Sequence, residues 1–456
     1  MANTYLTRTF GTPDGPGGGT FIWTMSAWIK KTGTGSDVGI MTRYVNANKF
    51  VKIFFNSDDQ LEYAVYNGNY QARYQTTARY RDVNSWYHIV VAQNSTLATA
   101  ADRVKIYVNG ELITSFAVNT QIGQNIGGDF NTVSAPHQIG AYNASQNFNG
   151  LMSHFHFCDN YQYAASDFGS VDSTTGNWKI KTSPSVSYGT TGYWILKDGN
   201  TVTDSSANSN TWTVAGGTLT KTEDNPSNVF ATLNPLHIQG NTNRTVNYGH
   251  TRFYINNTGW GSSLSTLGFS SGKFYVETKI LGLNSSTGYG SIAIQDINAF
   301  GSSGNTDANL MGNNASAGLG ADYRSGESSL KASNVTVSSN VGNFSNNDII
   351  GMAIDMDNKA LYIHNGGTYY QIGGVTGVPT SGASKTGAIT IPASIETCAI
   401  GVGGYTDRAD FACNFGNGYF ANVAVSSAGT NASGIGIFEY NVPAGYTALS
   451  TKGLNL

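Results

Sequence analysis

Hydrophobic and polar residues alternate along many short stretches of this 456-residue chain. In the stretch 21–30, every second residue from Phe21 to Ile29 is apolar. A two-residue period places these side chains on one face of an extended strand. Comparable stretches, rich in β-branched and aromatic residues, follow at 50–55, 61–66, 86–92, 104–108, 111–114 and 148–157. Such short strands at regular spacing predict an antiparallel β-sandwich.

A second set of alternating stretches begins near Phe253. Its strands are expected at 272–280, 349–355, 360–364, 368–372 and 397–402. Turn-forming Asn and Gly residues separate several of these stretches, which is typical of a meander of hairpins. The intervening stretches 301–321 and 325–347 are rich in Gly, Ser and Asn, and we expect them to form long surface loops.

The part of the chain between these two sets has a looser pattern. A short strand is expected at 192–196, among several turn signals. Trp178, Trp194 and Trp212 need to be buried, so this part is not expected to be a free linker. The sequence therefore predicts an all-β protein with a sandwich at 1–165, a connector with short strands at 166–250 and a second sandwich at 251–456.

The composition supports a β-rich fold and restricts the possible functions. Only 12% of residues are charged, whereas the chain has 56 Gly, 26 Tyr and 21 Phe residues. The net charge is −3 and no basic run occurs, which argues against nucleic acid as a partner. No apolar stretch reaches the roughly 18 residues that span a bilayer, so no membrane insertion is expected. The start of the chain lacks the pattern of a secretory signal, so synthesis in a cytoplasm without standard export is expected.

Particular motifs carry a resemblance to known families. The first sandwich resembles the concanavalin A-like lectin/glucanase fold in its laminin-G-like form, which implies a jelly-roll architecture. Its motifs are Met25-Ser-Ala-Trp-Ile-Lys30, Trp86-Tyr-His-Ile-Val90, Ile106-Tyr-Val-Asn-Gly110 and Phe148-Asn-Gly-Leu151. The second sandwich resembles SPRY domains. Its motifs are Ser271-Gly-Lys-Phe-Tyr-Val-Glu277, Ile350-Gly-Met-Ala-Ile-Asp-Met-Asp357 and Asp410-Phe-Ala-Cys-Asn-Phe-Gly416.

The order of the two modules is similar to that in tail-fibre and other virion proteins of marine tailed bacteriophages. The joint, at 174–179 and 224–235, and the ending at 443–454 carry this similarity. The resemblance implies a homotrimer on the exterior of a phage particle, on the tail or the head, in contact with other virion proteins.

Residues that might perform catalysis are scattered. Glycoside hydrolysis needs two carboxylates about 5–10 Å apart. None of the seven Glu residues has an acidic partner two positions away. Asp355 and Asp357 have such a spacing, but they lie where a strand enters a hairpin, and Asp is common in turns. We therefore expect a protein that is not an enzyme, and a polysaccharide depolymerase is the least favoured function.

Metal binding is also weakly indicated. Asp198, Asp204 and Asn208 are candidate calcium ligands, although turn chemistry explains them equally. His154 and His156 have a spacing that zinc uses, but no third ligand is evident. No cofactor is expected, with calcium as the one possibility. Cys158, Cys398 and Cys413 are expected to be buried free thiols.

Aromatic residues give the clearest indication of a binding site. Sugars bind through stacking on rings and through hydrogen bonds from nearby polar side chains. Two groups of residues are candidates for carbohydrate binding: Tyr63, Tyr66, Tyr70, Arg73 and Tyr74 in the first sandwich, and Tyr369 and Tyr370 in the second. We therefore expect an adhesin that binds a host cell-surface glycan without cleaving it. The alternative is a capsid decoration or tail scaffold protein that contacts only other virion subunits.

Overall fold

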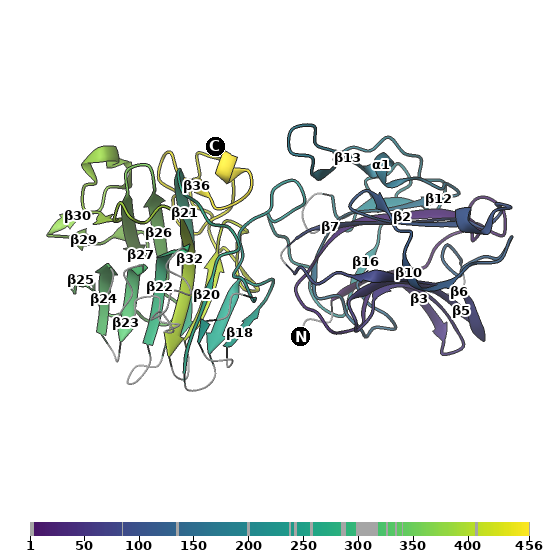
Figure 1. Cartoon of the computed structure of the whole chain (residues 1–456), viewed down its shortest axis with the longest axis horizontal. Helices are drawn as coiled ribbons and strands as arrows, with labels where there is room; N and C mark the ends of the chain where they lie inside the picture. The colour runs from purple at the N-terminus through teal and green to yellow at the C-terminus, as the bar shows by residue number, and fades with distance from the viewer. Residues whose placement is uncertain are drawn as a thin grey trace. The chain divides into compact units, whose positions relative to one another are not determined.

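The computed structural model contains two compact units, Met1–Lys221 and Thr222–Leu456, hereafter unit 1 and unit 2 (Figure 1). It describes residues 4–83, 85–133, 136–197, 201–236, 239–240, 244–255, 259–283, 289–297, 318–324, 327–332, 335–339, 341–405 and 409–455. Strands make up 48% of the chain and helices 4%, so the predicted all-β fold with antiparallel sandwiches is confirmed.

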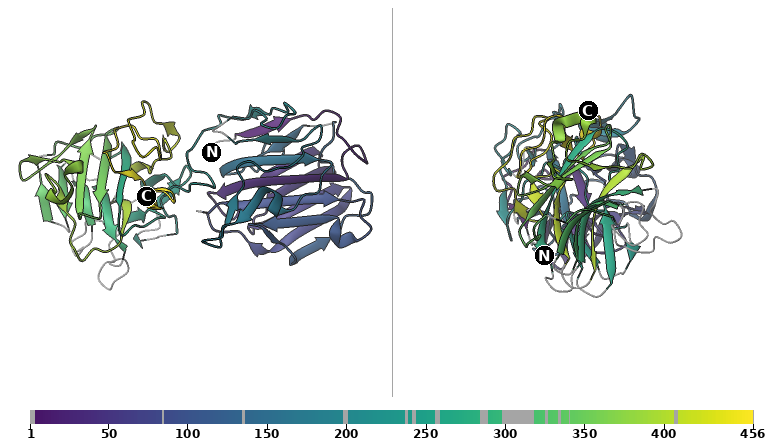
Figure 2. Two further views of the ribbon diagram at one scale, coloured as in Figure 1. Left: turned by 90° about the horizontal axis from the view of Figure 1, so that it is seen from above. Right: turned by 90° about the vertical axis from the view of Figure 1, so that its left-hand side faces the viewer.

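Unit 1 is built from an eight-stranded and a six-stranded sheet. The eight-stranded sheet has the order β10 (Phe116–Thr120), β6 (Asn69–Arg79), β5 (Gln60–Asn67), β4 (Lys49–Phe55), β3 (Val38–Asn46), β11 (His137–Ile139), β1 (Tyr5–Arg8) and β16 (Thr213–Ala215). The six-stranded sheet has the order β15 (Tyr193–Ile195), β12 (Gly150–Asp159), β2 (Ile22–Lys31), β7 (Tyr87–Asn94), β8 (Val104–Val108) and β9 (Glu111–Leu112). Figure 2 shows strands of this unit lying side by side.

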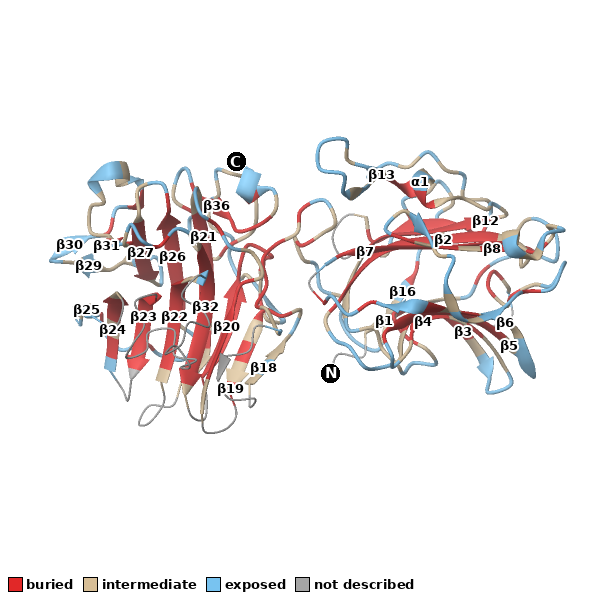
Figure 3. Ribbon diagram, viewed as in Figure 1, coloured by how far each residue is buried: buried red, intermediate tan, exposed pale blue. Residues whose placement is uncertain are grey.

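The core of unit 1 lies between its two sheets and follows the two-residue period of the strands. On β2, Trp23, Met25 and Ala27 point into this core and are fully buried. Val51 and Ile53 of β4 reach the same core from the opposite sheet. Each large apolar side chain that is withdrawn from water contributes about 1.5–3 kcal/mol. Figure 3 shows that buried residues concentrate in the paired strands.

The outer face of the six-stranded sheet is covered by the chain that follows β12. This chain contains the helix α1 (Ala165–Phe168) and the hairpin of β13 (Gly169–Val171) and β14 (Trp178–Ile180). Phe168 packs with Val90 and Cys158 in one apolar cluster on that face. Figure 1 shows α1 and β13 lying over β2 and β12.

Unit 2 also has two large sheets. The seven-stranded sheet has the order β17 (Gln239–Gly240), β20 (Trp260–Leu264), β32 (Cys398–Tyr405), β22 (Tyr289–Asp296), β23 (Gly318–Arg324), β24 (Glu327–Ala332) and β25 (Val335–Ser338). The nine-stranded sheet contains β18 (Arg244–Asn247), β19 (Arg252–Ile255), β33 (Asp410–Asn414), β21 (Lys273–Gly282), β26 (Ile349–Asp355), β27 (Ala360–Asn365), β28 (Thr368–Tyr369), β31 (Ile389–Thr390) and β36 (Thr447–Ala448).

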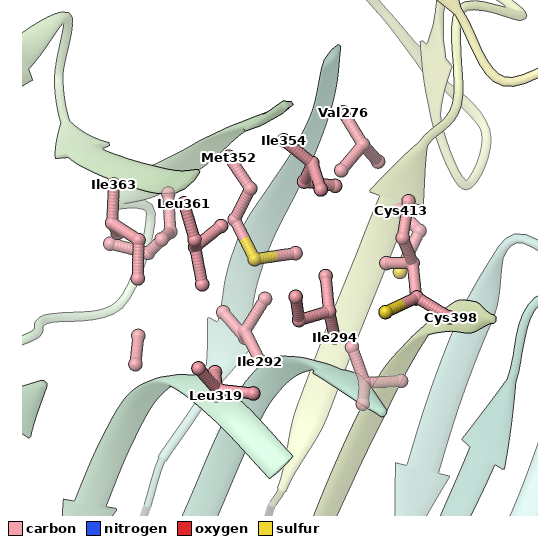
Figure 4. Close-up of a cluster of buried hydrophobic side chains, with 14 of the residues drawn as sticks. Val276, Ile292, Ile294, Leu319, Met352, Ile354, Leu361, Ile363, Cys398 and Cys413 are labelled. Atoms are coloured by element: carbon pink, nitrogen blue, oxygen red, sulfur yellow. The ribbon is translucent and has the colours of Figure 1, made fainter. Parts of the chain in front are cut away.

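The core of unit 2 lies between its two sheets (Figure 4). Met352 and Leu361 of the nine-stranded sheet belong to the same buried cluster as Ile294 and Leu319 of the seven-stranded sheet. Cys398 and Cys413 are buried in this cluster as free thiols, and Cys158 is a buried free thiol in unit 1. The prediction for the three cysteines is therefore confirmed.

Two stretches differ from their predicted structure. The predicted loop 325–347 contains the strands β24 and β25, because β24 pairs with β23 along six positions and β25 pairs with β24. Within the predicted loop 301–321, residues 318–321 belong to β23, and 301–317 lie outside the described residues. A stretch rich in Ser and Gly can thus form a strand where the neighbouring strands supply the pairing.

The stretch 166–250 contributes strands to both units. β15 pairs with β12, and β16 pairs with β1, so both strands extend the sheets of unit 1. β18 pairs with β19 in unit 2. Trp212 is buried in the core of unit 1, as expected from its size. In the described part of the chain, no helix is long and apolar enough to cross a membrane.

Candidate functional site

The outer face of the eight-stranded sheet carries an unusual set of side chains on β3, β4, β5 and β6. The strand registers place these side chains in three rows that run across the strands. The first row is Tyr44, Phe50, Tyr66 and Tyr70, the second is Thr42, Lys52, Ala64 and Arg73, and the third is Gly39, Phe54, Glu62 and Gln75. Adjacent rows are two residues apart along β4 and β5, which corresponds to about 6.6 Å, and β-bulges add one residue at one step on β3 and on β6.

Three rings of the first row contact one another in series, and Tyr44 joins them through a further ring. Phe50 and Tyr66 stack with their centroids 5.0 Å apart, and Tyr66 meets Tyr70 edge to face at 5.0 Å. Tyr142 adds a ring from outside the strands, 5.7 Å from Phe50 and 5.4 Å from Tyr44. We call Tyr44, Phe50, Tyr66, Tyr70 and Tyr142 the tyrosine face.

The four tyrosine hydroxyls of this face are available to a ligand. No hydrogen bond from any of them to another described residue occurs, and Tyr70 is 39% exposed. Burial raises the pKa of Tyr142 to about 12, and the neighbouring Tyr44 and Tyr70 add to this effect. Tyrosine combines a flat apolar ring with a hydroxyl that donates and accepts, so this face suits a ligand with both apolar and hydroxyl groups.

An ion pair lies beside the tyrosine face. Arg73 Nε donates to Glu62 Oε1 at 2.8 Å, and Arg73 Nη2 donates to Glu62 Oε2 at 3.3 Å. The side chain of Glu62 is 2% exposed and that of Arg73 is 33% exposed. The Arg73 guanidinium also lies 4.9 Å from the centroid of Tyr70, and the hydrogen bond with Glu62 raises the pKa of Arg73. The pair therefore holds both the carboxylate and the Tyr70 ring in position.

Lys52 occupies the middle of the second row. Its ammonium lies 3.6 Å from the centroid of Phe54, 5.1 Å from that of Tyr142 and 5.8 Å from that of Phe50. Burial lowers the pKa of Lys52, whereas Asp37 and Glu62 partly oppose this change. Cation–π attraction stabilises the charge in such surroundings.

The structure divides the predicted carbohydrate-binding residues of the first sandwich between two faces. Tyr66, Tyr70 and Arg73 lie together on the outer face. Tyr63 and Tyr74 are buried in the core instead. The Tyr63 hydroxyl donates to Gln93 Oε1 at 2.6 Å, and the Tyr74 hydroxyl accepts a hydrogen bond from the backbone of Ile122. These two residues are core residues because they point to the opposite side of the pleated sheet.

Other residues of the outer face were missed by the sequence analysis. The alternation in 50–55 places Phe50, Lys52 and Phe54 on the face of β4 that points away from the core. This alternation could have identified them from the sequence. Tyr142 lies in a turn far along the chain, and nothing in its local sequence indicates that it joins the same face.

The two predicted residues of unit 2 do not form a common platform. Tyr369 packs against a cluster that contains Tyr275 and Tyr362, whereas Tyr370 packs against the central core of the unit. The Tyr369 hydroxyl is buried and has no hydrogen-bond partner among the described residues. Consecutive residues of an extended chain point to opposite sides, so the two rings are separated.

Two of the candidate calcium ligands, Asp204 and Asn208, form hydrogen bonds within the protein. Both oxygens of Asp204 accept hydrogen bonds, from the backbone N–H groups of Trp194, Ser206 and Asn210 and from the Ser206 hydroxyl. The side-chain amide of Asn208 donates to backbone carbonyls. Asp198 lies outside the described residues. Among the described residues, no three His, Cys, Asp or Glu side chains gather into a possible metal site.

A buried Ser–His pair in unit 1 lacks the geometry of a nucleophile and its base. His88 Nε2 lies 2.9 Å from Ser26 Oγ, and Trp178 Nε1 donates to His88 Nδ1 at 3.0 Å. Because Nδ1 accepts, the proton of a neutral ring is on Nε2, which then donates to Ser26 and cannot remove its proton. Burial lowers the pKa of His88 to about 3, which keeps the ring neutral.

Asp355 and Asp357 are engaged at the start of a hairpin. Asp355 accepts from the backbone and the side chain of Asn358 and pairs with Lys273 at 3.0 Å. Asp357 accepts a hydrogen bond from the backbone N–H of Gly272 at 2.7 Å. These contacts agree with the turn-forming role.

Comparisons with known proteins relate the first part of the chain to lectin-like sandwiches. The concanavalin A-like lectin/glucanases superfamily matches residues 10–165, about a third of the chain. The search of curated proteins gives no match.

Solved structures show low similarity. The SPRY domain of human HERC1 is 14% identical, with 40% of this chain and 96% of that chain covered and a TM-score of 0.28. A putative carbohydrate binding protein from Bacteroides ovatus is 17% identical, with 48% of this chain and 59% of that chain covered and a TM-score of 0.31. A heptameric SAP-like pentraxin from Limulus polyphemus is 14% identical, with 35% and 71% covered and a TM-score of 0.25.

Proposed function

We propose that unit 1 binds carbohydrate, without cleaving it, on the tyrosine face of its eight-stranded sheet. The connected set of five rings, with four hydroxyls that bond to no other described residue, carries this proposal. Rings pack against the apolar face of a sugar, and the hydroxyls exchange hydrogen bonds with those of the ligand. The match of residues 10–165 to a lectin-containing superfamily supports the same function.

The carboxylates near this face support binding without catalysis. A glycosidase needs one carboxyl group that gives a proton and a second group that attacks or activates water. Glu62 is held by Arg73, and Asp37 accepts from the backbone of Ser57 and from the side chain of Gln146. Both carboxylates are therefore held in fixed hydrogen bonds, and Glu62 is paired with a cation, which disfavours the protonated form that a general acid needs.

A glycan array with the full chain tests this proposal. Tyr70→Ala is expected to lower binding at least about tenfold, since one stacked ring contributes about 0.5–1.5 kcal/mol beyond its buried area. Tyr161→Ala is the matched control, because Tyr161 is 40% exposed in the same unit and lies outside the tyrosine face. Absence of binding to any glycan, or equal loss in both variants, would contradict the proposal.

We propose further that the protein is exposed on the exterior of a tailed phage particle, where it attaches the particle to its host. The sequence similarity of the module order, the joint and the ending to virion proteins of marine phages supports this location. Repeated copies, such as a homotrimer, strengthen weak binding at each site. Labelling of the chain in purified particles tests this location: label on the tail together with adsorption to host cells supports attachment, whereas label confined to the capsid lattice supports decoration.

A further inference from the structure

Of the two cations beside the tyrosine face, Arg73 has an anionic partner and Lys52 has none among the described residues. Arg73 is neutralised by Glu62 through two hydrogen bonds. Lys52 is half-buried among three rings and forms no ion pair within 4.0 Å with a described residue. Most other lysines that border the sheets of unit 1 have an anionic neighbour, such as Lys31 with Asp59 and Lys49 with Asp129.

The two carboxylates closest to Lys52 in electrostatic terms are engaged elsewhere. Glu62 is bound by Arg73, and Asp37 accepts hydrogen bonds at the end of the neighbouring strands. The ammonium keeps three N–H donors that no described side chain or backbone oxygen accepts. A charged donor that is partly shielded from water forms a stronger hydrogen bond with an anionic acceptor, because the lower local dielectric constant strengthens their attraction.

We infer that the tyrosine face selects a carbohydrate that carries an anionic group, a carboxylate or a sulfate ester, and that Lys52 binds this group. This inference rests on the proposed function. The inference specifies that the ligand is anionic and that Lys52 is the residue that binds its charged group.

The arrangement of the rows fits such a ligand. The row of Lys52 lies next to the aromatic row, about 6.6 Å away along the strands. In a uronic acid the carboxylate is bonded directly to the sugar ring. A sugar that packs against Phe50, Tyr66 and Tyr142 therefore brings its anion next to the Lys52 ammonium. Lys52 itself is half-buried, so its ammonium stays within reach of a ligand on this face.

Paired probes that differ only in charge test the inference. Oligogalacturonate is compared with its methyl ester, and dextran sulfate is compared with dextran, by affinity electrophoresis or calorimetry of the full chain. We expect the charged member of at least one pair to bind about tenfold more tightly or better. The carboxylate pair and the sulfate pair distinguish the two possible anions.

Two variants separate specific recognition from general charge. Lys52→Met is expected to remove most of the ratio between the affinities for the charged probe and for its neutral partner. Lys105→Met removes the same charge from β8, where Lys105 pairs with Asp102, and is expected to keep the preference. Circular dichroism confirms that both variants fold.

The outcomes distinguish the inference from the proposed function. Equal binding of charged and neutral probes, or a preference that survives in Lys52→Met, overturns the inference while carbohydrate binding stands. If no probe and no arrayed glycan binds, the proposed function itself fails, and the inference fails with it.

Discussion

Glu62 and Arg73 form a two-point ion pair across β5 and β6, with the carboxylate almost completely buried and the guanidinium partly exposed. Glu62 lies on the outer face of a sheet, where a carboxylate normally contacts water. Its burial is caused by the side chains of neighbouring rows. The pair therefore contributes to the stability of unit 1 as well as to the position of Tyr70.

Removal of Arg73 is expected to destabilise unit 1. Arg73→Met leaves a buried carboxylate without its partner, which costs about 1–3 kcal/mol. Urea unfolding followed by tryptophan fluorescence measures this loss, since six of the seven tryptophans belong to unit 1. Arg79→Met is the control: Arg79 pairs with Asp58 where both are well exposed, so a change below about 0.5 kcal/mol is expected. Equal effects in the two variants would show that burial of Glu62 does not matter.

In unit 2, the buried Glu277 predicts a dependence of stability on pH. Its carboxylate accepts from the backbone N–H groups of Glu439 and Tyr440 at 2.8 and 2.7 Å and from the Tyr275 hydroxyl at 3.0 Å. Burial nevertheless raises the pKa of Glu277 to about 7 from its ordinary value of 4.5. The folded state then holds a proton that the unfolded chain releases between pH 4.5 and 7.

The contribution of Glu277 to the free energy of unfolding is therefore complete below pH 4.5. It decreases by about 3 kcal/mol as the pH rises to 7. Glu277→Gln is expected to abolish this change. Because His364 in the same network has a lowered pKa and acts in the opposite direction, the difference between wild type and Glu277→Gln is the quantity to measure. Urea-dependent labelling of Cys398 and Cys413 with a dithiodipyridine reagent reports on unit 2. A difference that stays constant with pH would contradict the prediction.

Unit 1 is expected to lose stability in acid because of His88. Burial lowers the pKa of His88 to about 3 in the folded state. Below pH 6.5, His88 therefore binds a proton in the unfolded chain, whereas it stays neutral in the folded protein. Stability falls by about 1.4 kcal/mol per pH unit for this group between pH 6 and 4. His88→Gln should reduce the slope of the free energy of unfolding against pH by that amount. Its effect on stability at pH 7 does not alter this expectation. Tryptophan fluorescence in urea at several pH values gives the slope, and an unchanged slope would refute the assignment.

The three thiols are expected to be unreactive in the folded protein. All are buried, and burial raises the pKa of Cys398 and Cys413 to about 12. Since only the thiolate attacks disulfide reagents, labelling should be negligible under native conditions and reach three thiols per chain in denaturant. Rapid labelling of a single thiol in native buffer would place that cysteine at an accessible position.

The strands could be predicted from the sequence because alternation and turn chemistry are local. The Asn109–Gly110 turn illustrates this, since both residues have the positive φ values, 50° and 87°, that a two-residue hairpin requires. The strands in 327–338 were missed because the stretch around them is rich in Gly, Ser and Asn, although Val335, Thr336 and Val337 are β-branched residues that favour a strand.

The binding face could be predicted only in part. Alternation separates Tyr63 from Tyr66, so their opposite orientations follow from the sequence. The same rule would place Tyr70 with Tyr74 on the core side. A β-bulge shifts the register so that Val65 pairs with Ala72 but Tyr66 pairs with Tyr70, and the extra residue turns Tyr70 outward. Tyr142 joins the face through tertiary folding alone, which no local pattern indicates.

Hydroxyl-radical footprinting of the full chain with and without a bound glycan tests most directly whether the tyrosine face is the binding surface. The account predicts that oxidation of Tyr66, Tyr70 and Tyr142 falls when the glycan binds, while oxidation of Tyr161 and Trp260 stays the same. Protection of Trp260 or Tyr161 with no change at Tyr70 would contradict it and place the glycan elsewhere on the protein.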